Sequence, residues 1–96
     1  MKLLTKEILK RLPALGSQDN NPDPMVQVKF FYPAGIGTWY AYEYDPETRI
    51  FFGQADLGFP ELGTFSLDEL EGFRGRFGLG IERDIHWEPR PLSQCK

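Results

Sequence analysis

The residues best suited to chemistry form one glycine-rich run in the C-terminal third of the chain, Phe73-Arg74-Gly75-Arg76-Phe77-Gly78-Leu79-Gly80. Guanidinium groups can grip a phosphate through paired hydrogen bonds, and aromatic rings can stack on unpaired bases. The run has neither the lysine of a Walker loop nor the spacing of a dinucleotide-binding loop. A structural interpretation is favoured: the glycines end a helix and form turns, Phe73 and Phe77 anchor the loop in the core, and the arginines pair with acids. Arg74 and Arg76 stay candidates for binding.

His86 is the only histidine, with Glu82, Asp84 and Glu88 at alternate positions around it. A catalytic histidine needs a nucleophile and an orienting partner, and nothing in the sequence identifies the nucleophile. An extended segment would place the imidazole and three carboxylates on one face, but Arg83 interrupts this acidic stretch, and hard-cation sites usually need more ordered oxygen ligands. We therefore expect no catalytic residue, no metal site and no cofactor. Arg83 is retained as a binding candidate.

Aromatic residues supply the remaining candidates. Tyr40, Tyr42 and Tyr44 alternate along a predicted strand, so we expect them on one face, with Trp39 on the other. A tyrosine row on an open sheet can stack unpaired bases, although such rows are more often packing pairs. Trp87 is a further aromatic candidate. Two short helices are too small to cover both faces, so the tail, a second subunit or a partner is expected to cover part of this surface.

The elements that position these residues can be read from periodicity and turn chemistry. Thr5 is expected to cap a helix with Ile8, Leu9 and Leu12 on one face, which Pro13 ends. A second short helix opens with Ser66 to Glu69, a capping box in which each residue's side chain bonds the other's amide, and ends near Gly72. Alternating apolar residues predict strands at 26–32, 38–44, 49–55 and 61–65, with 81–87 as a last strand or extended segment.

The turns between the strands are short, and the one at 45–48 begins Asp-Pro, which suits a type I turn. Tight turns favour a meander of hairpins. The first strand is expected to place Val26, Val28, Phe30 and Tyr32 on one face. A flexible loop is predicted near 16–24, and an extended surface tail over 88–96.

Composition bounds the class of protein. The chain has 96 residues, 15% of them aromatic, which suits one domain with an aromatic core. Its net charge is −3, and such a mildly acidic chain is poorly suited to non-specific phosphate binding. The lone Cys95, the absence of a signal-peptide pattern and the absence of a long apolar run favour a cytoplasmic protein without a membrane partner.

Several short motifs recur as an ordered set along nearly the whole chain: Met1-Lys2-Leu3-Leu4-Thr5-Lys6, Val28-Lys29-Phe30-Phe31-Tyr32-Pro33, Thr38-Trp39-Tyr40, Phe51-Phe52-Gly53, Glu61-Leu62-Gly63-Thr64-Phe65-Ser66-Leu67, Arg74-Gly75 and Gly78-Leu79-Gly80-Ile81-Glu82-Arg83-Asp84. As a set they resemble the bacterial "domain of unknown function 2958" family. The resemblance implies a bacterial protein, often carried on plasmids and other mobile elements. It implies no catalytic residues, since the family has no established activity.

The sequence therefore predicts one α+β domain over 1–96, with a small antiparallel sheet of four to five strands, an N-terminal helix and a short capped helix. The expected function is a non-catalytic binding module that contacts an unknown macromolecule, either protein or nucleic acid, and homo-oligomers are possible. One alternative is an anti-defence inhibitor that blocks a host nuclease complex. Another is a small phosphate-handling enzyme that uses the region from Arg74 to His86.

Overall fold

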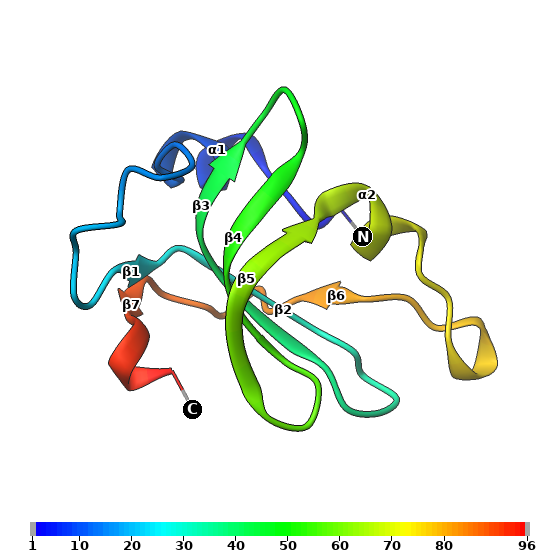
Figure 1. The fold of residues 1–96 in the computed structure, drawn as a ribbon. Coiled ribbons are helices and arrows are strands. Elements are labelled where there is room, and N and C mark those ends of the chain that lie inside the picture. The colour runs from blue at the N-terminus through cyan, green and yellow to red at the C-terminus, as the bar shows by residue number, and fades with distance from the viewer. Residues whose placement is uncertain (1, 96) are drawn as a thin grey trace.

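The structure is a computed structural model that describes residues 2–95; residues 1 and 96, the ends of the predicted domain and tail, lie outside the described residues. Figure 1 shows the arrangement of its helices and strands. Their bounds, in chain order, are α1 (Lys6–Arg11), β1 (Met25–Val26), β2 (Val28–Phe31), β3 (Thr38–Asp45), β4 (Ile50–Asp56), β5 (Pro60–Ser66), α2 (Leu67–Gly72), η1 (Arg76–Gly78), β6 (Glu82–Arg83), β7 (Arg90–Pro91) and η2 (Leu92–Gln94).

The main sheet is antiparallel and has five strands in the order β5-β4-β3-β2-β6. Strands β2 to β5 form the predicted meander, and their bounds lie close to those expected from the sequence. The α+β class and the two short helices are also as predicted. Within residues 2–95, no helix is long and apolar enough to cross a membrane.

The first predicted strand is divided at Gln27. Val28 to Phe31 pair with β3, whereas Met25 and Val26 form a separate two-stranded sheet with Arg90 and Pro91. As a result Val26 lies in a different apolar cluster from Val28, Phe30 and Tyr32, so the expectation of one shared face was wrong for Val26. The predicted extended segment over 81–87 is likewise shorter, because only Glu82 and Arg83 pair in the sheet and residues 85–86 turn.

A bulge in β3 divides the tyrosine row. The register with β4 shifts between Ala41 and Glu43, so Tyr42 has no direct partner. An extra residue resets the alternation of side chains along a strand. Tyr40 and Tyr42 therefore lie in one cluster and Tyr44 in the other, so the prediction of one shared face was wrong. Gly53 permits this geometry, because a Cβ there would lie 1.9 Å from the carbonyl oxygen of Tyr40.

The helices cover one face of the sheet, which we call the helix face. Thr5 caps α1 as predicted, since its Oγ1 accepts from the amide of Ile8 at 3.2 Å. Ile8 and Leu12 pack against the core, whereas Leu9 is exposed, so only part of the expected apolar face is buried. Phe30 and Phe51 lie at the centre of this core with ring centroids 5.3 Å apart, among side chains from both helices.

The tail covers the other face, which we call the tail face. Trp87, Leu92 and Cys95 pack there against Tyr40 and Tyr42, and Figure 1 shows the tail, drawn orange to red, returning beside β1. The tail is fixed by Asp23, whose carboxylate accepts from the Ser93 amide at 2.9 Å and its hydroxyl at 2.6 Å. The sequence led us to expect the tail, a second subunit or a partner over part of the aromatic surface, and on this face the structure shows the tail. The prediction that the tail lies on the surface was wrong for Cys95, which is buried.

The loop before β1 is held by a buried carboxylate. Glu43 is 2% exposed, and its two oxygens accept from the amides of Gly16 at 2.8 Å and Gln18 at 2.7 Å. Backbone amides satisfy a buried carboxylate that would otherwise be costly to desolvate. The flexibility predicted for residues 16–24 stays a prediction.

Candidate functional site

The helix face is open at one end, where a groove of about 430 Å³ lies between α2, two hairpin turns and the loop after α2. Its lining is apolar apart from Ser66 and Glu69, and we use "the groove" for these residues: Tyr32, Ile36, Trp39, Leu57, Phe65, Ser66, Glu69, Leu70, Phe73 and Ile81. The size and apolar character are those of a ligand or side-chain binding cleft. The groove is therefore the leading candidate for a binding site.

Two turns project apolar side chains at its mouth. Ile36 comes from the turn between β2 and β3, and Leu57 from the turn between β4 and β5; both are strongly exposed. Turns normally carry polar or small residues at such positions. Phe59, two residues after Leu57, is also exposed. Monomeric proteins seldom expose apolar side chains in contiguous groups, so this end has the composition of an interaction surface.

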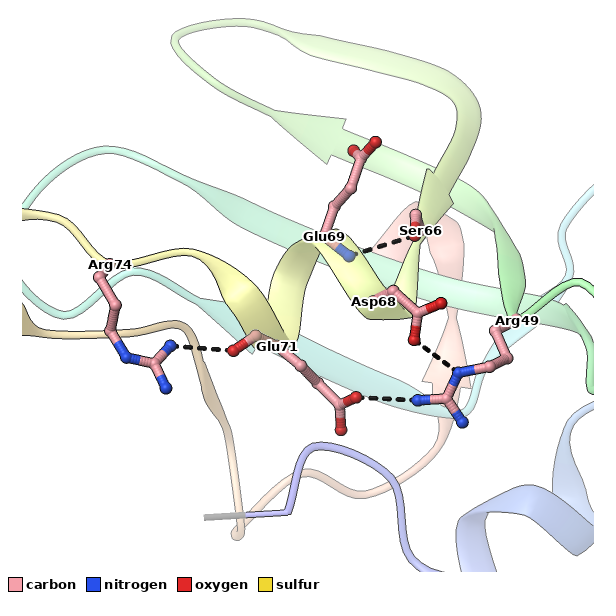
Figure 2. Close-up of polar contacts among 6 residues, drawn as sticks. All are labelled: Arg49, Ser66, Asp68, Glu69, Glu71 and Arg74. Atoms are coloured by element: carbon pink, nitrogen blue, oxygen red, sulfur yellow. Dashed lines mark hydrogen bonds and ion pairs between the residues drawn. The ribbon is translucent and has the colours of Figure 1, made fainter.

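Helix α2 forms one wall, and its position is fixed at both ends. The Glu69 amide donates to Ser66 Oγ at 3.2 Å, which is half of the predicted capping box. In Figure 2 the Glu69 side chain points away from Ser66, and Ser66 pairs with Ile50 in the sheet, so the reciprocal half was wrong. Because the Glu69 side chain does not fold back onto Ser66, it can line the groove.

A pair of ionic contacts joins α2 to the turn after β3. Arg49 Nε lies 2.6 Å from Asp68 Oδ1, and its Nη2 lies 2.9 Å from Glu71 Oε1, as Figure 2 shows. The hydrogen bond that Arg49 donates to the Asp68 carboxylate raises the pKa of Arg49 above its ordinary value. Both pairs are solvent-exposed, so they orient the helix more than they stabilise it.

The loop over residues 73–80, which we call the aromatic loop, forms another wall. Phe73 packs edge-on against Tyr32 at 5.3 Å and lines the groove. The Arg76 amide donates to the Tyr32 hydroxyl at 2.6 Å, and the Gly75 amide donates to the Leu79 carbonyl at 2.8 Å. Gly75 leaves room for this contact, because a Cβ there would lie 2.2 Å from the Tyr32 hydroxyl oxygen and would displace the ring.

Phe77 stands at the tip of this loop and is 91% exposed. Its φ of 58° lies in the left-handed region, which is unusual for a bulky residue. The prediction that Phe73 and Phe77 anchor the loop in the core was therefore wrong for Phe77, and Phe73, although it packs on Tyr32, is itself 45% exposed. The prediction that Arg74 pairs with acids was also wrong. Its Nη1 donates to the backbone carbonyls of Glu71 at 2.9 Å and Phe73 at 2.7 Å.

The tyrosines proposed as base-stacking residues are buried. Tyr40, Tyr42 and Tyr44 are exposed by only 4% to 6%, and burial raises the pKa of all three hydroxyls. Tyr44 packs on Phe51 at 4.6 Å on the helix face. Tyr40 packs on Trp87 at 5.8 Å on the tail face. These rings form the two cores and offer no open row to a base.

Trp87 has a structural position as well. Its Nε1 donates to the Val26 carbonyl at 3.1 Å, and the guanidinium carbon of Arg90 lies 4.2 Å from its ring centroid. The cation lies on a ring that is already packed against Tyr40, so this contact strengthens the tail's attachment.

The remaining candidates lie apart from the groove. Arg83 donates through Nη1 to the Lys2 carbonyl, which ties the N-terminal segment to β6. Arg83 and Arg74 line two different hollows. The His86 amide donates to Asp84 Oδ1 at 2.9 Å, so that carboxylate is used within a turn. Within residues 2–95, no cluster of three or more potential metal ligands occurs.

The sequence interpretation named Arg74 and Arg76, which lie on the aromatic loop but do not line the groove, and it missed Ile36 and Leu57. The signal that could have found them is an apolar side chain among turn residues, in Gly35-Ile36-Gly37 and in Leu57-Gly58-Phe59. The groove also depends on contacts between segments far apart in the chain, such as Tyr32 with Phe73. Those contacts have no signature in a single sequence.

The fold and this site define a small α+β protein with an open apolar groove at one end of an antiparallel sheet. The chain belongs to the family described as "Protein of unknown function (DUF2958)", whose model matches residues 3–95. No curated protein and no solved structure matches it.

Proposed function

We propose that the protein is a non-catalytic protein-binding module, and that the groove with its exposed rim is the contact surface. The observation that carries this proposal is the combination of an apolar cleft of about 430 Å³ with exposed Ile36 and Leu57 at its mouth. Burial of such side chains is the main driving force of protein association. Aromatic residues at the centre of an interface commonly supply most of its affinity, which gives Phe73 and Phe77 a role.

The chemistry of the groove favours a protein over a nucleic acid. Its one ionisable acid is Glu69, a carboxylate that would repel phosphate, and the chain's net charge is −3. The tyrosine row that would have supported base stacking is buried. Arg74 and Arg76 are exposed on the aromatic loop, but Arg74 already donates to backbone carbonyls, and two arginines are a small footprint for a polyanion.

The arrangement of the arginines favours binding over phosphate chemistry. Arg74 and Arg83 donate to backbone carbonyls, where they hold a helix end and the N-terminal segment. The setting we propose is the bacterial cytoplasm, in a protein carried by mobile elements. This setting is supported by the family membership and by a lone cysteine that suits a reducing compartment.

Site-specific photocrosslinking in the bacterial host tests the proposal. A benzophenone amino acid at Ile36 or Leu57 should capture a distinct polypeptide other than the protein itself. The matched control is Ile85, which is 64% exposed and lies outside the groove. A second variant, Leu57→Asp, should remove the crosslink formed from position 36, because a charge at the mouth opposes apolar burial.

Equal crosslinking from positions 36 and 85, or capture of nucleic acid from the groove positions, would contradict the proposal. The identity of the captured polypeptide decides the biological role. A host nuclease subunit would assign the anti-defence role, whereas another mobile-element protein would assign an assembly role.

A further inference from the structure

The strained and exposed tip of the aromatic loop carries a second inference. Phe77 adopts a left-handed backbone conformation at a free-energy cost, yet its ring contacts almost nothing within the molecule. The loop around it is ordered by bonds from Gly78 N to the Gly75 carbonyl and from Leu79 N to the Arg76 carbonyl, at 3.1 Å and 3.0 Å. The backbone that carries this ring is held in one conformation, so the ring can dock at an interface with little loss of backbone entropy.

We propose that the groove of a second copy of this chain receives Phe77, so that two copies exchange their aromatic loops. This inference rests on the proposed function only in treating the groove as a protein-docking surface. A groove of about 430 Å³ with an apolar lining is large enough for an aromatic ring. The molecule thus carries both halves of one contact, a projecting phenylalanine and an open apolar cleft.

Charge complementarity selects the second copy as the occupant. Arg76 precedes Phe77 and is exposed, and Glu69 is exposed on the groove wall. A phenylalanine that enters the groove of the second copy brings its neighbouring arginine to the groove's only acid. The exchange forms the same Arg76–Glu69 pair twice, once for each loop.

The position of the loop favours a closed dimer over an open chain of molecules. Phe73, at the start of the aromatic loop, is itself part of the groove wall, so the projecting tip and the cleft belong to the same end of the molecule. Two copies related by a twofold axis can then satisfy both contacts at one interface. Such an isologous contact closes on itself and leaves no free docking end.

Sedimentation velocity over a concentration series, in reducing buffer, tests the dimer. The wild-type protein should show a monomer–dimer equilibrium. Phe77→Ala should weaken dimerisation about thirtyfold, as expected for an aromatic anchor at the centre of an interface. Ile85→Ala is the matched control, because it removes an exposed apolar side chain outside the groove and should leave the dissociation constant unchanged.

A charge exchange makes the test specific for the proposed contact. Arg76→Glu and Glu69→Arg should each weaken the dimer, and the double variant should recover much of the wild-type affinity. Circular dichroism should show that all variants keep the wild-type fold, since both side chains are exposed. A protein that stays monomeric into the millimolar range, a dimer insensitive to Phe77→Ala, or a double variant without recovery would overturn the inference.

The two tests separate the two proposals. Capture of a foreign polypeptide at positions 36 and 57 by a strictly monomeric protein would leave the proposed function standing and remove the dimer. A Phe77-dependent dimer without any foreign polypeptide at these positions would retain the dimer and remove the proposed function.

Discussion

One face of the five-stranded sheet is closed by the chain's own tail, whereas the helices close the opposite face over only part of its area. On the tail face, Trp87, Leu92 and Cys95 cover Tyr40 and Tyr42. On the helix face, α1 and α2 bury Phe30 and Phe51 but leave the groove open beyond α2.

The two faces also differ in how they use their aromatic rings. Trp87 is tied to Val26 by a hydrogen bond and its ring packs against Tyr40, so the ring belongs to the fold. Phe77 is held by its backbone alone, and its ring belongs to the surface. Aromatic content by itself therefore does not reveal function in this chain. The position of a ring relative to the two faces shows whether it belongs to a core or to the surface.

The largest expected effect on stability concerns Gly53, which accommodates the bulge in β3 that sends Tyr42 and Tyr44 to different faces. A Cβ at this position would lie 1.9 Å from the Tyr40 carbonyl oxygen and 2.9 Å from the Ala41 Cα. Because backbone atoms cannot move aside cheaply, Gly53→Ala should lower the free energy of unfolding by about 3 kcal/mol. Urea unfolding followed by circular dichroism measures the change.

Gly63 offers a matched control, since it pairs directly with Gly53 across β4 and β5 and a Cβ there meets no atom within 4 Å. Gly63→Ala should change stability by no more than about 0.5 kcal/mol. Similar losses for both variants would mean that the bulge does not depend on the missing side chain at position 53.

The strands of the meander were predictable because their signals are local. Alternating apolar residues and the Asp45-Pro46 turn define β3 and β4 within a residue or so of the observed bounds. The Arg49 amide bonds to the Asp45 carbonyl at 2.8 Å, and Arg49 takes a φ of 59°, so it belongs to the turn and β4 begins at Ile50. Turn chemistry and strand period are both written within a few neighbouring residues.

The pairing of β1 with β7 and the bulge at Tyr42 were not predictable in the same way. Two-residue strands carry no periodic signal, and Met25 and Pro91 are far apart in the chain. The bulge depends on a glycine in the neighbouring strand, not on the tyrosines themselves. Likewise, the aromatic loop that carries Phe77 is held by the hydrogen bond from the Arg76 amide to the hydroxyl of Tyr32, which follows β2 and is far away in the chain.

A direct comparison of Trp87 with Phe77 tests whether the two faces differ as described. Trp87→Ala should destabilise the protein by about 2 kcal/mol, less than for a fully buried tryptophan, because its ring is only partly buried. Phe77→Ala should change the free energy of unfolding by no more than about 0.5 kcal/mol, since the side chain is 91% exposed. Urea titrations of the two variants under reducing conditions provide the measurement.

The thiol of Cys95 gives a second readout for the tail face. Burial raises the pKa of this thiol, so it should react slowly with a thiol reagent at mildly alkaline pH in the wild-type protein. Trp87→Ala should speed the reaction by opening the tail, and Phe77→Ala should not. Equal rates in all three proteins would show that the tail does not protect the face it covers.

The smallest expected effect is a dependence of the tail's attachment on pH. The hydroxyl and amide of Ser93 hydrogen-bond to Asp23 and lower the pKa of its carboxyl. The bound form is therefore stabilised at all pH values above the ordinary carboxyl pKa of about 4, and this contribution is lost as the pH falls through the lowered value. In a Trp39→Phe background, the emission of Trp87 should move to longer wavelength on acidification as the tail loosens. Asp23→Asn should weaken the attachment already at neutral pH and remove this acid transition, while the far-ultraviolet circular dichroism of the protein stays unchanged. An unchanged transition in Asp23→Asn would assign it to another carboxyl group.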